Sequence, residues 1–191
     1  MADEVLEEAV DAVADEESAA VRARRDAALA HVRTLGDPVL RTQALEVSHF
    51  DGQLLEQVER MREIMDGALG VGLAASQVGV LARLLVYRVE PDGPIAAVVN
   101  PRVEWQGEET ESAEEGCLSI PGIRVDVDRF VHLRVGGRDE HGASLTIEAS
   151  GLEARVLQHE IDHLDGVLML DRTSRQERRD AMRAWRERQH E

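Results

Sequence analysis

Lysine is absent from this sequence, cysteine occurs once, and there is no long apolar run. The single cysteine, Cys117, cannot close an intramolecular disulfide, which is consistent with a reducing compartment. No segment approaches the roughly 18 consecutive apolar residues of a membrane-spanning helix, so we expect no membrane partner. The acidic first residues lack the basic and apolar regions of a secretory signal, which favours a cytoplasmic location.

Basic residues are also scarce relative to acidic ones. The 22 basic residues, all of them arginine, stand against 38 acidic residues and give a formal net charge of −16. This balance argues against DNA as a partner, because binding to duplex DNA requires positive charge that neutralises phosphates. A chain of 191 residues suits one compact domain that buries a core without disulfides.

The two ends of the chain differ in composition from its middle. Residues 1–30 hold nine acidic residues against three arginines, with a weak helical repeat of apolar residues. This predicts an acidic, partly helical N-terminal extension outside the main core. Residues 31–191 are expected to form a single domain. Its last segment, 171–191, carries seven arginines against five acidic residues and predicts a C-terminal arginine-rich helix.

Hydrophobic periodicity gives a coarse prediction for the middle of the chain. Residues 53–67 repeat apolar side chains every three or four positions, as a helix with one buried face does. A loop of glycine and small residues is expected at 69–80. Further helices are expected at 152–164 and 174–187, and strands at 81–90, 96–105, 131–137 and 144–150. Helices at both ends of a run of strands, without βαβ alternation, indicate an α+β fold.

The motif H-E-x-x-H begins at His159 and ends at His163, within a predicted helix. Four-residue spacing places both histidines on one helix face, where their imidazoles can reach one metal ion. Glu160 lies close enough to act on a metal-bound water without binding the metal. The same face continues an apolar stripe, so a role in the core stays open. We expect small, mostly antiparallel sheets packed around this central helix, with a C-terminal helix.

A catalytic site of this kind needs a third protein ligand. The metzincin pattern fails, because Met169 stands where that family has its third histidine. Cys117 lies in a loop-like segment, and its thiolate would complete a Cys-His-His set with an open position for water. Two alternatives stay open. They are a zincin-type metallopeptidase that uses Glu177, Glu187 or Glu191, and a non-enzymatic domain with a closed structural zinc site that uses His132 or His141.

The segment from Gly70 to Gln77 is rich in glycine and alanine. It does not complete a dinucleotide-binding G-x-G-x-x-G pattern, because Ala75 stands at the last position, and it lacks the Gly-Lys-Ser/Thr of a phosphate loop. Small residues there permit close approach of another backbone. Gln77 would place an amide beside that approach.

Three segments together resemble the peptide deformylase family. The family motifs G-x-G-L-A-A-x-Q, E-G-C-L-S and Q-H-E-x-D-H-L-x-G occur intact and in this order at 70–77, 115–119 and 158–166. The resemblance covers roughly residues 32–170 and leaves the acidic extension outside. It implies that 31–191 is a catalytic metallohydrolase domain that removes the N-formyl group from formyl-methionine at the start of newly synthesised peptides, releasing formate.

The resemblance also implies residue roles. Cys117, His159 and His163 would bind Fe²⁺, for which Zn²⁺, Ni²⁺ or Co²⁺ can substitute, although coordination rules alone suggest Zn²⁺. Glu160 would transfer the proton of the attacking water. The side-chain amide of Gln77 and the backbone N–H of Leu118 would stabilise the oxyanion.

Substrate contacts are expected along the first motif and on the helix. The peptide would lie as a strand against Gly70–Gly72, with Val71, Leu152 and Val156 forming the methionine pocket and Arg124 near the peptide backbone. The expected partners are formyl-methionyl peptides and nascent chains. A stripe formed by Arg172, Arg175, Arg179, Arg183 and Arg186 would dock on ribosomal RNA if the helix were continuous.

Overall fold

The computed structural model describes residues 18–189. Residues 18–29 form a helix, and the rest of the predicted acidic extension, residues 1–17, lies outside the described part. The last turn of this helix already touches the core, because Ala28 is buried and Leu29 packs against it. The domain boundary predicted at residue 30 therefore falls within a packed segment. None of the helices within 18–189 has the length and apolar character needed to cross a membrane.

The larger sheet has five antiparallel strands in the order β1-β2-β3-β6-β7. Their bounds are β1 (Gly72–Ala74), β2 (Leu84–Tyr87), β3 (Ala96–Gln106), β6 (His132–Arg138) and β7 (Ser144–Ser150). Strand β1 forms one edge of this sheet. The register brings Gly72 opposite Tyr87 and His132 opposite Ser150.

Two helices cover the two faces of this sheet. Asp51 is the N-cap of helix α2 (Gly52–Gly67). Its carboxylate accepts hydrogen bonds from the N–H groups of Gln53 and Leu54. The apolar face of α2 packs on Leu84 and Val86 of β2. Helix α3 (Gly151–Leu164) packs on Leu85 and Tyr87 from the other side. Strand β2 is buried on both faces because its side chains alternate between two cores.

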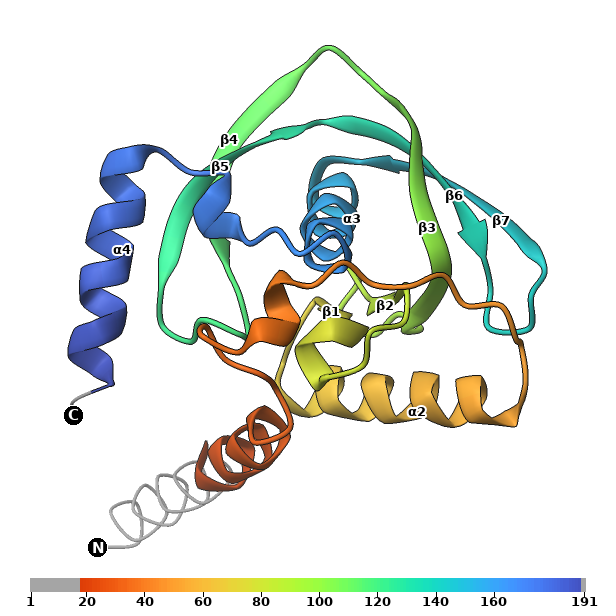
Figure 1. Ribbon diagram of the computed structural model, residues 1–191, viewed down its shortest axis with the longest axis horizontal. Helices are drawn as coiled ribbons and strands as arrows, with labels where there is room; N and C mark the ends of the chain where they lie inside the picture. Colours follow the sequence, from red (N-terminus) through yellow and green to blue (C-terminus); the bar gives the residue numbers. More distant parts are fainter. Residues whose placement is uncertain (1–17, 190–191) are drawn as a thin grey trace, which may run out of the picture.

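A second, two-stranded sheet joins β4 (Thr110–Gly116) to β5 (Arg124–Phe130). It arches over α3, so that this helix lies between the two sheets (Figure 1). Helix α4 (Arg175–Arg188) begins at Ser174 and buries Ala181 and Trp185 against the β5 side. The α+β architecture with a central H-E-x-x-H helix and a C-terminal helix is confirmed.

Several details differ from the sequence prediction. The expected loop 69–80 contains strand β1 and a 3-10 helix, η2 (Ala75–Val78), and the expected strand 81–90 is only four residues long. The sheet formed by β4 and β5 was not predicted. The stripe of five arginines is broken, because Arg172 lies outside α4 and its guanidinium binds Asp162. Four of the five remain on α4.

Candidate metal centre

The predicted metal ligands converge in the described structure. Cys117 directly follows β4, and His159 and His163 come from one face of α3. One ligand atom from each lies within 4.8 Å of the others, and the Cys117 sulfur is 3.2 Å from Nε2 of His163. A thiolate and two imidazoles at this separation fit a tetrahedral metal ion that keeps one position open.

The three ligand side chains influence one another's protonation. Burial alone would raise the pKa of the Cys117 thiol, but the neighbouring imidazoles of His163 and His159 hold it well below its usual value. The pKa of His159 is raised, since the thiolate and Glu115 outweigh the effect of burial. The site therefore favours the thiolate that a metal requires. The Nδ1 atom of His163 is buried and has no hydrogen-bond partner among the described residues.

Glu160 lies beside the three ligands and does not belong to the set. Its side chain is buried, and burial raises the pKa of its carboxyl group. One carboxylate oxygen, Oε2, has no hydrogen-bond partner within 18–189. The carboxylate rests against Gly72, where any Cβ atom would overlap it. A side chain at this position would have to displace the Glu160 carboxylate, so glycine permits the close approach of Glu160 to β1.

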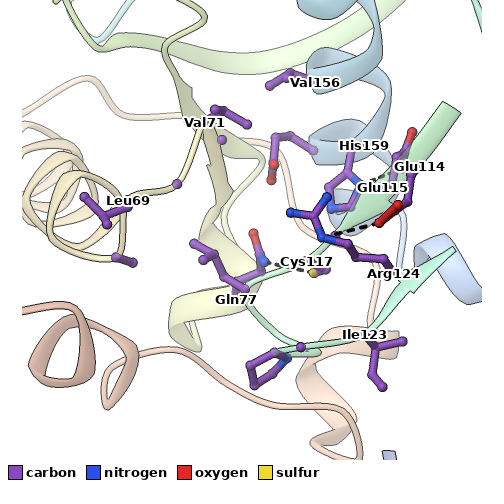
Figure 2. A pocket seen from close by; sticks show the side chains of 18 of the residues that line it. Leu69, Val71, Gln77, Glu114, Glu115, Cys117, Ile123, Arg124, Val156 and His159 are labelled. Carbon is purple, nitrogen blue, oxygen red and sulfur yellow. Dashed lines mark hydrogen bonds and ion pairs between the residues drawn. The ribbon is translucent and has the colours of Figure 1, made fainter. Parts of the chain in front are cut away.

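Gln77 is held in one orientation by its neighbours. Its Oε1 accepts a hydrogen bond of 2.8 Å from the N–H of Ala74, which leaves the amide nitrogen facing the ligand cluster. That nitrogen lies 3.6 Å from the sulfur of Cys117 and 3.2 Å from the hydroxyl of Ser119. Figure 2 shows the amide directed at the sulfur. A fixed N–H donor at this point can stabilise negative charge that develops beside the metal.

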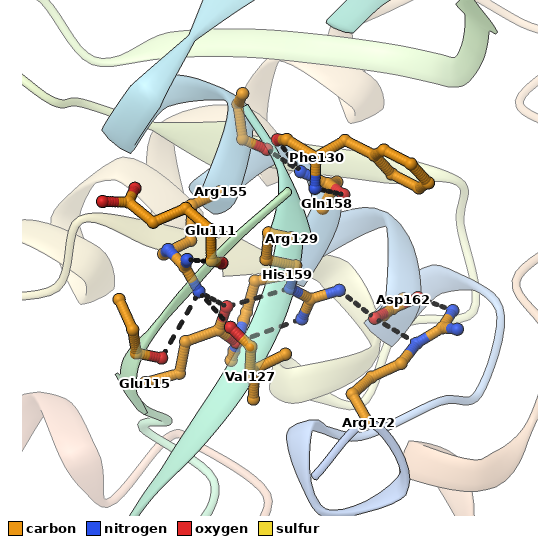
Figure 3. A network of polar contacts seen from close by, with 12 residues as sticks. Glu111, Glu115, Val127, Arg129, Phe130, Arg155, Gln158, His159, Asp162 and Arg172 are labelled. Carbon is orange, nitrogen blue, oxygen red and sulfur yellow. Dashed lines mark hydrogen bonds and ion pairs between the residues drawn. The ribbon is translucent and has the colours of Figure 1, made fainter. Parts of the chain in front are cut away.

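A buried carboxylate supports His159 from behind (Figure 3). Glu115 accepts hydrogen bonds from His159 Nδ1 at 2.9 Å, from Arg129 at 2.9 and 3.0 Å, and from Arg155 at 2.9 Å. Burial would raise the pKa of Glu115, but the His159 and Arg129 contacts hold it at about 2. The carboxylate fixes the imidazole so that Nε2 faces the metal position.

The same network continues to the C-terminal side of the domain. Arg129 donates to Asp162 at 2.6 Å, and Asp162 also accepts two hydrogen bonds from Arg172. Arg129 and Asp162 are both buried, whereas the Arg172 side chain is 49% exposed. A continuous set of ion pairs thus joins β4, β5, α3 and the segment before α4.

A cleft of about 400 Å³ opens onto the metal position. The predicted substrate residues all line it: Gly70, Val71, Gly72, Arg124, Leu152 and Val156. Figure 2 shows Val71 and Val156 facing each other across the cleft. Arg124 is 69% exposed and lies 3.4 Å from Glu114. The open edge of β1 forms one wall, where a peptide strand can add to the sheet.

The alternative ligands lie elsewhere. Glu177 is bound to the hydroxyls of Thr173 and Ser174, and Glu187 is an exposed residue of α4. His132 and His141 are not among the residues that approach the ligand cluster. The zincin and closed-site readings are therefore not supported; Glu191 lies outside the described residues.

Sequence reasoning missed the support for His159. Glu115 belongs to a quoted motif, but nothing local assigns it a role, and Arg129 and Arg155 come from other elements. One signal was available for Arg155. It stands four residues before His159, so helical spacing places the two side chains on the same side of α3.

Comparison with known proteins finds relatives over most of the chain. The family model for polypeptide deformylase matches residues 29–179. A Corynebacterium efficiens protein named peptide deformylase 1 is 47% identical over 153 residues, which is 79% of this chain and 90% of that protein. A Parafrankia peptide deformylase is 44% identical over 156 residues, covering 82% and 85% of the two chains.

Solved structures give the same result. A Synechococcus elongatus peptide deformylase in complex with actinonin superposes with a TM-score of 0.77 at 40% identity, covering 80% of this chain and 85% of that one. The Thermotoga maritima enzyme gives a TM-score of 0.72 at 47% identity, with 75% and 96% covered. The chain belongs to the polypeptide deformylase family.

Proposed function

We propose that this chain is a metal-dependent hydrolase that removes the N-formyl group from the formyl-methionine of newly synthesised peptides and releases formate. The observation that carries this proposal is the ligand cluster, in which Cys117, His159 and His163 offer three atoms within 4.8 Å beside the buried Glu160. When bound, the metal would lower the pKa of a water molecule and supply the nucleophile.

The residues around the ligands have two roles, which are proton transfer and stabilisation of the developing negative charge. Glu160 accepts the proton of the attacking water and delivers it to the amine that leaves. Burial raises the pKa of its carboxyl group, which favours uptake of this proton. Gln77 and the backbone N–H of Leu118 donate to the oxygen that becomes negatively charged. Ala74 orients Gln77 for this task through its own N–H.

The peptide lies as an added strand along the segment that leads into β1. Backbone pairing with Gly70–Gly72 holds the chain without reading its sequence, and the methionine side chain enters between Val71, Leu152 and Val156. Leu152 is 55% exposed and Val71 is 51% exposed, so both offer apolar surface that substrate would cover. Arg124 stands beside the peptide backbone.

The proposed metal is Fe²⁺, with Zn²⁺, Ni²⁺ or Co²⁺ as substitutes. The decisive experiment is anaerobic purification followed by metal analysis and a formate-release assay on formyl-Met-Ala-Ser. We expect one metal ion per chain and release of formate that stops when a chelator removes the metal. Formate release that continues in the metal-free protein would refute the proposal.

The proposed place of action is the cytoplasm, at the ribosome. Arg175, Arg179, Arg183 and Arg186 are exposed along α4, and such a stripe can bind ribosomal RNA through salt-sensitive contacts. Sedimentation with purified ribosomes tests this. Binding at low salt that disappears when the four arginines are replaced by glutamine supports docking, and no binding at low salt refutes it.

A further inference from the structure

The N-terminal helix (residues 18–29) reaches the cleft. Arg25 and Leu29 line it together with Ala68 and Leu69, at the end of α2. The family match begins at residue 29, so Arg25 lies outside the matched segment. This helix therefore adds a wall to the cleft that the three family motifs do not supply.

Specific contacts hold the helix in this place. Ala28 packs closely on the end of α2. A Cβ atom added to Gly67 would lie only 2.9 Å from the Cβ of Ala28. Asp66 forms ion pairs with Arg24 and, at 2.7 Å, with Arg88, and these contacts lower the pKa of Asp66. Figure 1 shows the helix meeting the end of α2. Arg25 is thus presented from an anchored helix.

The position of Arg25 defines which part of a peptide it can meet. The reaction centre lies at Gly72, since Glu160 rests against this residue. A peptide strand advances about 3.3 Å per residue, so residues three and four lie about 7–10 Å further on. In an antiparallel alignment with Gly70–Gly72, residue three lies opposite Gly70. Residue four then passes Leu69, where a φ of 57° ends the extended backbone and which lines the cleft together with Arg25.

Among the described residues, none of the carboxylates that line the cleft forms an ion pair with Arg25. The other two arginines that line the cleft are engaged, Arg124 with Glu114 and Arg155 with Glu115. Within residues 18–189 no ion pair involves Arg25, although its helix neighbour is Asp26. A carboxylate that enters the cleft with the peptide would therefore meet this guanidinium.

We propose that Arg25 is a specificity-determining residue that favours a carboxylate at the third or fourth position of the formylated peptide. This inference rests on the proposed function. The carboxylate can be an acidic side chain or the C-terminus of a short peptide. Because an exposed ion pair contributes little, the preference for glutamate over glutamine is about two- to five-fold in kcat/KM.

The test uses the full chain and formyl-Met-Ala peptides with glutamate, glutamine or lysine at position three or four. Amidated C-termini isolate the side chain, and matched free acids report on the terminal carboxylate. We expect kcat/KM to decrease from glutamate through glutamine to lysine. The decrease should come from a higher KM, with little change in kcat. Raising the salt concentration should reduce the differences in kcat/KM between the three peptides.

Two variants of one helix complete the design. Arg25→Glu should reverse the order, whereas Arg22→Glu makes the same charge change at a residue that does not line the cleft and should preserve it. Formyl-Met-Ala-amide is too short to reach Arg25 and should be hydrolysed equally by all three proteins. An order unchanged by Arg25→Glu overturns the assignment. No formate from any peptide would overturn the proposed function as well.

Discussion

Replacing Glu115 by glutamine tests whether the buried carboxylate supports the metal centre. Glutamine keeps the shape of the side chain and removes its charge from between Arg129, Arg155 and His159. A pKa of about 2, against an ordinary 4.5, corresponds to about 3 kcal/mol of stabilisation of the carboxylate, at 1.36 kcal/mol per pH unit. Loss of one partner from a buried ion pair costs a similar amount, about 3–5 kcal/mol.

Urea unfolding of chelator-treated protein measures this cost without a contribution from bound metal. With a slope of about 2 kcal/mol per molar urea, Glu115→Gln should lower the midpoint by about 1.5 M. The pKa of Glu115 is depressed in the folded state, so its stabilisation is complete above about pH 4.5 and is lost as the pH falls towards 2. The difference between the two proteins should shrink accordingly in acid.

Metal retention provides a second readout. A residue that orients a ligating histidine contributes about 10- to 100-fold to metal affinity, so Glu115→Gln should lose its metal to a chelator far more readily. Glu114→Gln is the matched control, because Glu114 precedes it on β4, is 53% exposed and contacts only Arg124 among these groups. If both variants had the same midpoint and the same metal affinity, the supporting role of Glu115 would be refuted.

Three further outcomes are expected at the site itself. Glu160→Ala should retain its metal and lose nearly all formate release, because only the proton acceptor is removed; turnover within a few-fold of wild type would contradict this. Cys117→Ala should lower metal content and activity together, as metal analysis beside the assay will show, and an intact metal site would exclude the thiolate as a ligand. Gln77→Ala should reduce kcat by about 10²–10³-fold with metal content unchanged, and a loss of metal instead would assign Gln77 a structural role.

The convergence of the candidate metal ligands could be expected from the sequence, because these residues are close in sequence or lie in compact motifs. His159, Glu160 and His163 lie on one helix, α3. Regular helix geometry therefore fixes their relative positions once the helix is predicted. The role of Glu115 was not predictable in this way. Its partners Arg129 and Arg155 lie on β5 and α3, and only tertiary packing brings them together.

The sheet of β4 and β5 shows why part of the fold escaped prediction. Strand β4 reads Thr-Glu-Ser-Ala-Glu-Glu-Gly, a composition with little strand preference. Strand β5 does alternate, with Val125 and Val127 buried, but the next inward position holds Arg129. A buried arginine interrupts the apolar pattern of the strand. Here that arginine binds Glu115, the carboxylate that orients His159.

The short edge strand β1 has a consequence for how the protein behaves at high concentration. An open sheet edge recruits other chains and leads to aggregation. This edge is only three residues long, and it is followed by the 3-10 helix η2 and preceded by Leu69, whose φ of 57° departs from extended backbone. It can pair with a short peptide, yet it is too short to template a second sheet. An edge kept open for catalysis is thereby protected from self-association.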